Sequence, residues 1–477
     1  MPVRRLSLVA LLLLTLSCNT LTRAFTPVEP TLAPPPAVTD APTIPVITET
    51  PLTPIDIEGA PPILYTPPGC QNVPPATVPP ATTVAEPTAT PLVAGNPEIS
   101  TDEQKRIFEK LVGTIERVYV YPDYNGKDWP GIVNNYRAKV EAGLNTETFY
   151  IEMNAMIADL GDEHSHFESP AEVAASNADL SGALDYVGIG ILVQSLPEKG
   201  RVTVLAVFPN SSAERGGLKA HDSILAVDGS PIAQDGEAHP QWVRGPECSA
   251  VVLSVESPGQ SPRDLAFIRY RITDPQPIDA KLVNTTDGSR IGYIFLPTFF
   301  DETIPGQVEQ ALQDFGDLDG LILDNRMNGG GSSLVVEPIL SYFTSGKLGE
   351  FASRNDSRSF NVASNPIHNS QTVPLVVLVG EDTVSFGEIF SGILRDIGRA
   401  KIVGQTTLGN VETMYGYDFE DGSRAWIAQE RFDPPVSHEF WEQTGIVPDV
   451  EAFADWDTFT FENDPAVTAA VELLGHK

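Results

Sequence analysis

The chain has 477 residues, of which 41% are hydrophobic, and this combination excludes a wholly disordered protein and predicts two or three domains. Its 30 lysines and arginines stand against 64 aspartates and glutamates, a net charge of -34 that repels phosphate backbones and argues against nucleic acid as a partner. Three cysteines are too few for a disulfide-scaffold protein.

The chain begins with a segment typical of export. Residues 1–18 place two arginines ahead of an apolar run at 6–16 and end in a serine followed by Cys18. The run falls well short of the roughly 20 residues that span a bilayer as a helix, which argues against a permanent membrane span. A small residue before cysteine resembles the processing site of bacterial lipoproteins, although Thr15 holds a place where leucine is usual. We therefore expect an extracytoplasmic protein anchored to the bacterial membrane through a lipid on Cys18, with simple secretion as the alternative.

Residues 19–97 read as a linker. They hold 20 of the 42 prolines, mixed with threonine, alanine and valine, and have neither a helical nor a strand period. Such a stretch is semi-extended and acts as a spacer between an anchor and a folded body; a merely tolerated linker is the alternative. Cys70 lies in this linker and Cys248 in the folded part, so the two can pair outside the cytoplasm, but spacing alone does not fix the connectivity.

The folded body divides into parts with different periodicity. In residues 98–180 apolar residues recur at three- and four-residue steps, which predicts helices. Residues 184–272 contain short β runs broken by turn residues, which predicts a small β-rich module. In residues 278–455 strand-like and helix-like stretches alternate, which predicts an open sheet covered by helices, and 456–477 read as a C-terminal tail. The expected fold class is α/β: an N-terminal helical region, an inserted β-rich module and an open α/β core.

Ser385 lies where a buried-strand run, 374–380, turns into a helix-like stretch, 386–397. A serine at such a turn can present its hydroxyl at the edge of a sheet, where N–H groups of the helix start stabilise an oxyanion. The alternative is a plain N-cap, because Ser385 and Glu388 have the spacing of a capping box.

Two further motifs favour the chemical interpretation of Ser385. The run 321–331 is a strand-like stretch that ends in a glycine-rich turn, which can bring backbone N–H groups to an anion. The run 160–166 contains His164 and His166. A His-x-His pair can bind metal, but no cysteine partner and no convincing further histidine ligand accompanies it. A catalytic base is the better use, because imidazole titrates near neutral pH and can take a serine proton.

In this order the motifs resemble the tail-specific, or C-terminal processing, serine proteases, over about residues 99–450. The runs 187–191, 209–218 and 222–229 are similar to the PDZ domain that these enzymes insert before the protease core. The core motifs follow in the family's order: Ile-Gly-Tyr-Ile at 291–294, Asp-Asn-Arg-Met-Asn-Gly-Gly-Gly at 324–331, Ser-Phe-Gly-Glu-Ile-Phe at 385–390 and Gly-Arg-Ala-Lys-Ile-Val-Gly at 398–404. The resemblance implies a serine peptidase whose nucleophile is Ser385.

The chain departs from the family pattern at the base. Many members pair the serine with a lysine and a glutamine, but Asn410 and Met414 hold those places here. Neither side chain can accept a serine proton at neutral pH, which argues against a Ser-Lys mechanism. A second branch, which includes the tricorn-like proteases, uses a histidine before the PDZ domain and a glutamate late in the core. His164 in Asp-Glu-His-Ser and Glu442 in Glu-Gln-Thr-Gly-Ile-Val-Pro-Asp are similar to that branch's motifs.

The resemblance therefore implies a triad. Ser385 attacks the peptide carbonyl, His164 takes and returns the proton, and Glu442 holds the imidazole tautomer and stabilises its charged form. His166 is the competing base, with a surface histidine beside a turn as its alternative role. His438 is a further rival, for which a core or surface role fits as well.

Family position also implies two groups of backbone donors. The N–H groups of Gly330 and of Phe386, the residue after the nucleophile, are the candidates for the oxyanion hole. In the PDZ domain the N–H groups around Gly188, Ile189 and Gly190 would hold the terminal carboxylate of a substrate tail that adds as a strand. The expected partner is a protein or peptide with an apolar last residue; a domain that only regulates access to the cleft is the alternative.

The leading hypothesis is a serine endopeptidase with no metal and no organic cofactor. A non-catalytic PDZ-type binding protein is the second hypothesis, and a hydrolase of cell-wall peptides or other small acyl substrates is the third. The sequence names neither the natural substrate nor the oligomeric state.

Overall fold

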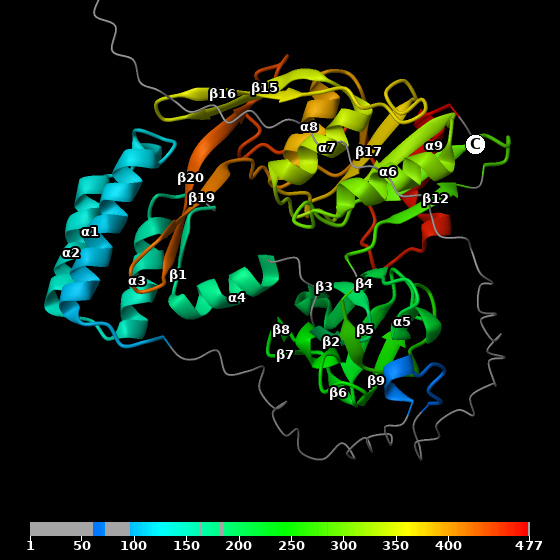
Figure 1. Ribbon diagram of the computed structural model, residues 1–477, viewed down its shortest axis with the longest axis horizontal. Helices are drawn as coiled ribbons and strands as arrows, with labels where there is room; N and C mark the ends of the chain where they lie inside the picture. Colours follow the sequence, from blue (N-terminus) through cyan, green and yellow to red (C-terminus); the bar gives the residue numbers. More distant parts are fainter. Residues whose placement is uncertain are drawn as a thin grey trace, which may run out of the picture. The chain divides into compact units, whose positions relative to one another are not determined.

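The structure is a computed structural model, and it describes residues 61–71, 96–162, 164–180, 186–273, 275–283 and 285–475. The expected export segment with Cys18 and most of the expected linker lie outside the described residues. Figure 1 shows N-terminal helices in cyan, a β-rich module in green and an α/β core that runs from green to red. The fold class expected from the sequence is confirmed. Within the described part of the chain, no helix has both the length and the apolar character needed to cross a bilayer.

The helical region begins with a capping box, in which the Ser100 side chain accepts the Glu103 N–H and the Glu103 side chain accepts the Ser100 N–H. Its helices are α1 (Thr101–Val118), α2 (Trp129–Ala142), α3 (Thr146–Ala158) and α4 (Pro170–Leu180). The apolar faces of α1, α2 and α3 pack into one core together with Ala425, Ile427 and Ala428. These three residues belong to β20 (Arg424–Asp433), a strand from the C-terminal half of the chain, so the helices pack against that half.

The β-rich module is a sheet with the strand order β10-β9-β5-β4-β3. Its strands are β3 (Ile191–Leu196), β4 (Arg201–Val207), β5 (Ser223–Val227), β9 (Ala250–Glu256) and β10 (Arg263–Ile268). A second ladder pairs β2 (Tyr186–Gly188) with β11 (Tyr270–Ile272). Strand β3 forms one edge of the main sheet, directly after the loop 188–190.

Part of the expected linker folds with this module. Ile63 forms a parallel bridge with Ala266 of β10, and Ile63 and Cys70 are buried beside it. Cys70 and Cys248 form a disulfide, which the sequence left open. Figure 1 shows the segment in blue beside β9.

The core sheet has the order β12-β13-β14-β17-β18-β21 and is parallel except for β12. Its strands are β12 (Asp279–Val283), β13 (Ile291–Phe295), β14 (Gly320–Asp324), β17 (Leu375–Val379), β18 (Lys401–Gly404) and β21 (Val450–Glu451). Four helices accompany them: α6 (Ile304–Phe315), α7 (Ser333–Phe343), α8 (Phe386–Asp396) and α9 (Pro465–Leu473).

Side chains alternate between the two faces of this sheet, and both faces are buried. Ile294 packs in the cluster that contains α6, α7 and α8, whereas Tyr293 and Phe295 pack with α9. The expected C-terminal tail thus contains a helix that covers one face of the sheet.

A second sheet, which the sequence analysis did not predict, brings distant segments together. Its order is β1-β20-β15-β16, and β19 pairs with β20. Its strands are β1 (His166–Glu168), β15 (Gly346–Ser353), β16 (Ser357–Val362), β19 (Thr413–Asp418) and β20 (Arg424–Asp433). Because His166 pairs with Trp426, the residues just before β1 lie against the core.

Candidate active site

Ser385 occupies a sharp turn directly before α8. Its backbone has φ +56° and ψ -124°, a conformation that costs a non-glycine residue roughly 1–3 kcal/mol and persists where surrounding structure enforces it. Such turns between strand and helix expose a nucleophile.

The carboxylate of Glu388 holds this turn. It is fully buried and accepts hydrogen bonds from the Ser385 N–H (3.1 Å), the Gly409 N–H (2.7 Å), the Asn410 N–H (2.8 Å) and the Thr407 hydroxyl (2.5 Å). Burial raises the pKa of Glu388, and the four hydrogen bonds oppose that rise. Glu388, which the sequence analysis paired with Ser385 as a capping box, therefore also binds the 407–410 segment to the serine turn.

Gly330 lies against the serine on the other side. A Cβ added to Gly330 would lie 2.8 Å from the Ser385 Cβ, 2.9 Å from the Val384 carbonyl oxygen and 3.1 Å from the Phe386 nitrogen. As the first residue of α8, Phe386 has an N–H with no acceptor inside the helix. The Gly330 N–H, by contrast, donates to the Asn328 side chain at 2.9 Å. Of the two expected oxyanion donors, only the Gly330 N–H is thus engaged by a side chain.

Buried hydrogen bonds connect the Ser385 turn and the start of α8 to the segments that follow β14 and β17. The Thr383 hydroxyl donates to the Asn325 carbonyl oxygen at 2.8 Å, and the Asn325 side chain donates to the Gly387 carbonyl oxygen (2.8 Å) and the Ser391 hydroxyl (2.9 Å). All of these side chains are buried. The ends of β14 and β17 are therefore locked to the start of α8.

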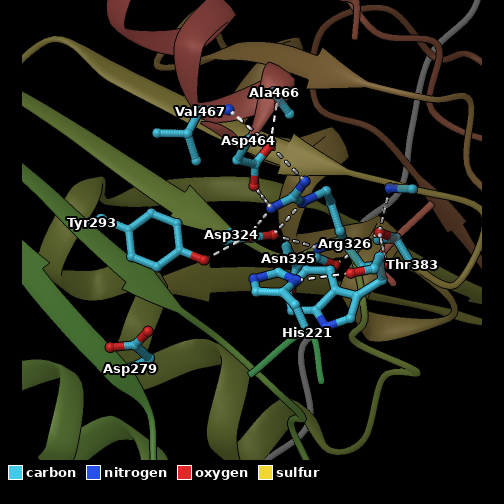
Figure 2. Close-up of polar contacts among 12 residues, drawn as sticks. His221, Asp279, Tyr293, Asp324, Asn325, Arg326, Thr383, Asp464, Ala466 and Val467 are labelled. Atoms are coloured by element: carbon cyan, nitrogen blue, oxygen red, sulfur yellow. Dashed lines mark hydrogen bonds and ion pairs between the residues drawn. The ribbon is translucent and has the colours of Figure 1, made fainter. Parts of the chain in front are cut away.

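These hydrogen bonds continue into a buried ionic network, shown in Figure 2. The Arg326 guanidinium pairs with Asp324 and with Asp464, each at 2.6 Å, and Asp464 also caps the start of α9. The Tyr293 hydroxyl donates to Asp324 at 2.7 Å. His221 lies beside the network, with Nδ1 2.9 Å from the carbonyl oxygen of Trp456.

His164 is the histidine that the structure places next to buried acids. The Asp162 carboxylate accepts its N–H at 3.1 Å, which fixes the local turn. The His164 Nδ1 lies 3.9 Å from Glu412 Oε2. By contrast, the ring of His166 contacts the His164 carbonyl oxygen (2.9 Å) and Glu168 (3.8 Å). The acidic side chain beside His166 is thus Glu168, whereas the one beside His164 is Glu412.

The rival base His438 is exposed and pairs with Asp433 at 3.1 Å, a surface role. Burial lowers the pKa of His164 to about 4, while the charge of Asp162 opposes that shift. His164 is therefore neutral at neutral pH, the form that accepts a proton.

Glu442 is also buried, and its Oε2 accepts the Val411 N–H at 2.8 Å. Burial, together with the charge of Glu412, raises the pKa of Glu442 to about 8. Burial, together with the charge of Asp162, raises the pKa of Glu412 to about 7. Sequence reasoning missed Glu412, because no motif marks it; its only signal is an acidic residue two positions after Asn410.

The segment 410–412 connects the two halves of the site. The Asn410 carbonyl oxygen accepts the Ser385 N–H at 3.0 Å, Val411 bonds to Glu442, and Glu412 faces His164. Within the described residues, no hydrogen bond joins the His164 ring to the Ser385 hydroxyl. The structure thus groups Ser385 with Gly330 and Phe386, and it places His164 against Glu412. Glu442 is joined to the same segment through the Val411 N–H.

The loop expected to bind a substrate carboxylate precedes edge strand β3. The Ile189 carbonyl oxygen accepts the Ala213 N–H at 2.9 Å, and the Gly190 carbonyl oxygen accepts the Phe208 N–H at 3.0 Å. Gly190 has φ +86°, and a Cβ there would lie 2.4 Å from the Ser211 Cβ. The loop is therefore fixed with its carbonyls turned to the module. Among the residues placed by the structure, no group of three or more His, Cys, Asp or Glu side chains is arranged to hold a metal ion.

Known proteins with related sequences are peptidases. The pattern of peptidase family S41 matches residues 290–452, and that of the PDZ domain matches residues 186–244. Carboxyl-terminal-processing peptidase 3 of Arabidopsis thaliana, a chloroplastic protein, is 27% identical over 384 residues, covering 78% of this chain and 73% of the relative. The carboxyl-terminal-processing protease of Synechocystis sp. is 27% identical over 385 residues, covering 78% and 87%.

One solved structure shows the same architecture at comparable identity. The photosystem II D1 C-terminal processing protease is 25% identical, with a TM-score of 0.53 over 77% of this chain and 97% of that protein. Residues 290–452 therefore form a serine peptidase domain of family S41, and a PDZ domain precedes it at residues 186–244.

Proposed function

We propose that this peptidase cleaves proteins or peptides outside the cytoplasm and selects them by their C-termini. The observation that carries the chemical part is the strained Ser385 turn, with Gly330 and the Phe386 N–H beside it. The names of the carboxyl-terminal-processing relatives support the substrate class.

In the proposed reaction the Ser385 hydroxyl oxygen bonds to the scissile carbonyl carbon while His164 takes the hydroxyl proton. The oxyanion is held by the Phe386 N–H and, when it turns from Asn328, by the Gly330 N–H. His164 then gives its proton to the leaving amine, and water releases the acyl group by the same route in reverse. A buried acidic group that includes Glu442 stabilises the charged imidazole. The missing bond between His164 and Ser385 would form when substrate closes the site.

The PDZ domain is proposed to bind the end of the substrate. An extended tail adds to edge strand β3, and its carboxylate meets the N–H groups around Gly188, Ile189 and Gly190. An apolar last side chain fits the apolar residues of the domain, and the free carboxylate supplies the selectivity for chain ends.

The proposed location rests on the export segment, with lipid attachment at Cys18, and on the disulfide. Disulfides form and persist outside the reducing cytoplasm, and that between Cys70 and Cys248 joins the linker to the PDZ domain. Replacing Cys18 with alanine in the producing cell tests the anchor: the protein should move from the membrane fraction to the soluble one. An unchanged membrane fraction would exclude a lipid on this cysteine.

The substrate proposal is tested with two peptides of one sequence that end in an apolar residue, one with a free carboxylate and one with a terminal amide. We expect the free acid to be cleaved with a KM at least about tenfold lower, because the amide cannot use the carboxylate loop. Equal kinetics for the two would remove C-terminal selection. Cleavage of small acyl esters with neither peptide cut would instead favour a hydrolase of small substrates.

A further inference from the structure

Two buried polar atoms in the site face each other without partners. His164 Nδ1 and Glu412 Oε2 lie 3.9 Å apart, and the side chains are 10% and 1% exposed. Within the described residues neither atom has a hydrogen-bond partner. An unpaired buried polar atom costs about 1–3 kcal/mol, so each such pair requires an explanation.

The separation is too long for a hydrogen bond but short enough that a small rotation of the ring closes it. A bond from Nδ1–H to Oε2 would satisfy both atoms at once. It would also fix the tautomer in which the other ring nitrogen, Nε2, carries the lone pair that accepts a proton.

Glu442 is engaged differently. Its Oε2 accepts the Val411 N–H at 2.8 Å, and Val411 immediately precedes Glu412. The carboxylate suggested by the family motif thus binds the backbone that carries Glu412, whereas Glu412 itself faces the imidazole.

We propose that Glu412 is the positioning residue that orients His164, and that Glu442 acts one step further away by holding the 411–412 backbone. The inference rests on the proposed roles of Ser385 and His164. In the reaction Glu412 accepts the Nδ1–H bond and stabilises the imidazolium that forms when Nε2 takes the Ser385 proton. No proton moves to Glu412.

Several titratable groups surround this pair on the neighbouring elements. They are Asp162 and His166 next to His164, Tyr119 and Tyr121 at the end of α1, Glu442 and Glu388 from the core, and Arg431 of β20. The Tyr121 hydroxyl donates to Glu412 and opposes the rise of its pKa, which burial nevertheless sets to about 7. Because only the anion can stabilise an imidazolium, kcat should rise as pH increases through about 7.

The test compares Glu412→Gln and Glu442→Gln in the full-length chain, with the exposed Glu451→Gln as a matched control. A quenched-fluorescence peptide with an apolar free C-terminus gives kcat and KM from pH 5 to 9. We expect Glu412→Gln to lower kcat about 100-fold or more with KM unchanged and to abolish the rise near pH 7. Glu442→Gln should lower kcat by about tenfold at most and keep the rise, and the control should match the unaltered chain.

The inference would be overturned if kcat of Glu412→Gln stayed within about threefold of that of the unaltered chain and still rose as pH increased through about 7. A loss of this rise in Glu442→Gln alone would also overturn it, because it would give the orienting role to Glu442. If circular dichroism shows that Glu412→Gln does not fold, Glu412→Asp replaces it in the test. The kcat of Glu412→Asp must still rise with pH, and a kcat that does not change with pH would contradict the proposal. Ser385→Ala separates the two proposals. Full activity in that variant would contradict the proposed mechanism itself. A rate that depends on Ser385 but not on Glu412 would contradict only this inference.

Discussion

At the site, the conformation of Ser385 and the proposed role of Glu412 both depend on contacts with residues distant in the sequence. Ser385 can keep a positive φ because Glu388, Asn410 and Gly330 fix the turn from three sides. The sequence could nominate Ser385, because a strand run and a helix run meet there. It could not nominate Glu412, whose role comes from a contact with a residue 248 positions earlier in the chain.

Gly330→Ala should nearly abolish turnover. Its Cβ would meet the Ser385 Cβ at 2.8 Å in a backbone conformation with φ +95°, so the serine or the oxyanion donors must move. We expect kcat to fall about 100-fold or more, because misplacing the reacting group by about 1 Å costs that much. Gly329→Ala is the control, because a Cβ there meets nothing within 4 Å. Equal losses in both variants would refute the steric argument.

The buried acids also predict how stability depends on pH. The pKa values of Glu412 and Glu442, about 7 and about 8, lie above those of an unfolded chain, so the folded state binds more protons and loses stability as pH rises through this window. His164, with a pKa of about 4, acts oppositely, but only below about pH 6.5. Between pH 6.5 and 8.5 the free energy of unfolding should therefore fall less in a Glu412→Gln, Glu442→Gln double variant than in the unaltered chain. Identical slopes in urea titrations would contradict the assigned shifts.

At the scale of elements, buried and exposed strands differ in how well the sequence predicts them. Strands β14 and β17 are buried along their whole length and read as continuous apolar runs, so they were predicted. Strand β16 is largely exposed, and β15 and β19 mix exposed and partly buried positions, so none of them reads as a continuous apolar run. The second sheet was therefore missed. That sheet carries the segment before β1, and hence His164, to the core.

The linker segment 61–71, which packs against the PDZ domain, leads to a prediction about thermal stability. Cys70→Ser with Cys248→Ser removes a cross-link between residues 178 positions apart. Loss of a native disulfide typically costs about 2–5 kcal/mol, so the melting temperature of the chain or of its PDZ transition should fall by several degrees. Adding a reductant to the unaltered chain should give the same shift. An unchanged melting curve in both experiments would mean that the segment contributes no stability.

For the whole molecule, the C-terminal region is part of the core, although the sequence suggested a tail. Residues 456–477 contain one proline and four acidic residues, but α9 carries an apolar face that covers β14, β17 and β18. Arg326 joins this helix to the sheet through Asp464 and Asp324, and the same strand end leads to the buried hydrogen bonds of the Ser385 turn.

Arg326→Met should destabilise the whole fold. It leaves two buried aspartates without a counter-charge, and breaking a buried pair in this way costs about 3–5 kcal/mol. Chemical denaturation should show this loss, while Arg117→Met, at an exposed position of α1, should change stability by less than about 0.5 kcal/mol. A loss below about 1 kcal/mol for Arg326→Met would show that the aspartates rearrange or protonate at little cost.

The central claim is that Ser385 and His164 act together as nucleophile and base. It is tested most directly by cleavage of an unfolded protein such as casein at pH 8, with the full-length chain, Ser385→Ala, His164→Ala and His166→Ala compared. The account predicts that cleavage disappears in the first two variants and persists in the third. Cleavage that survives Ser385→Ala, or that depends on His166 and not on His164, would contradict it.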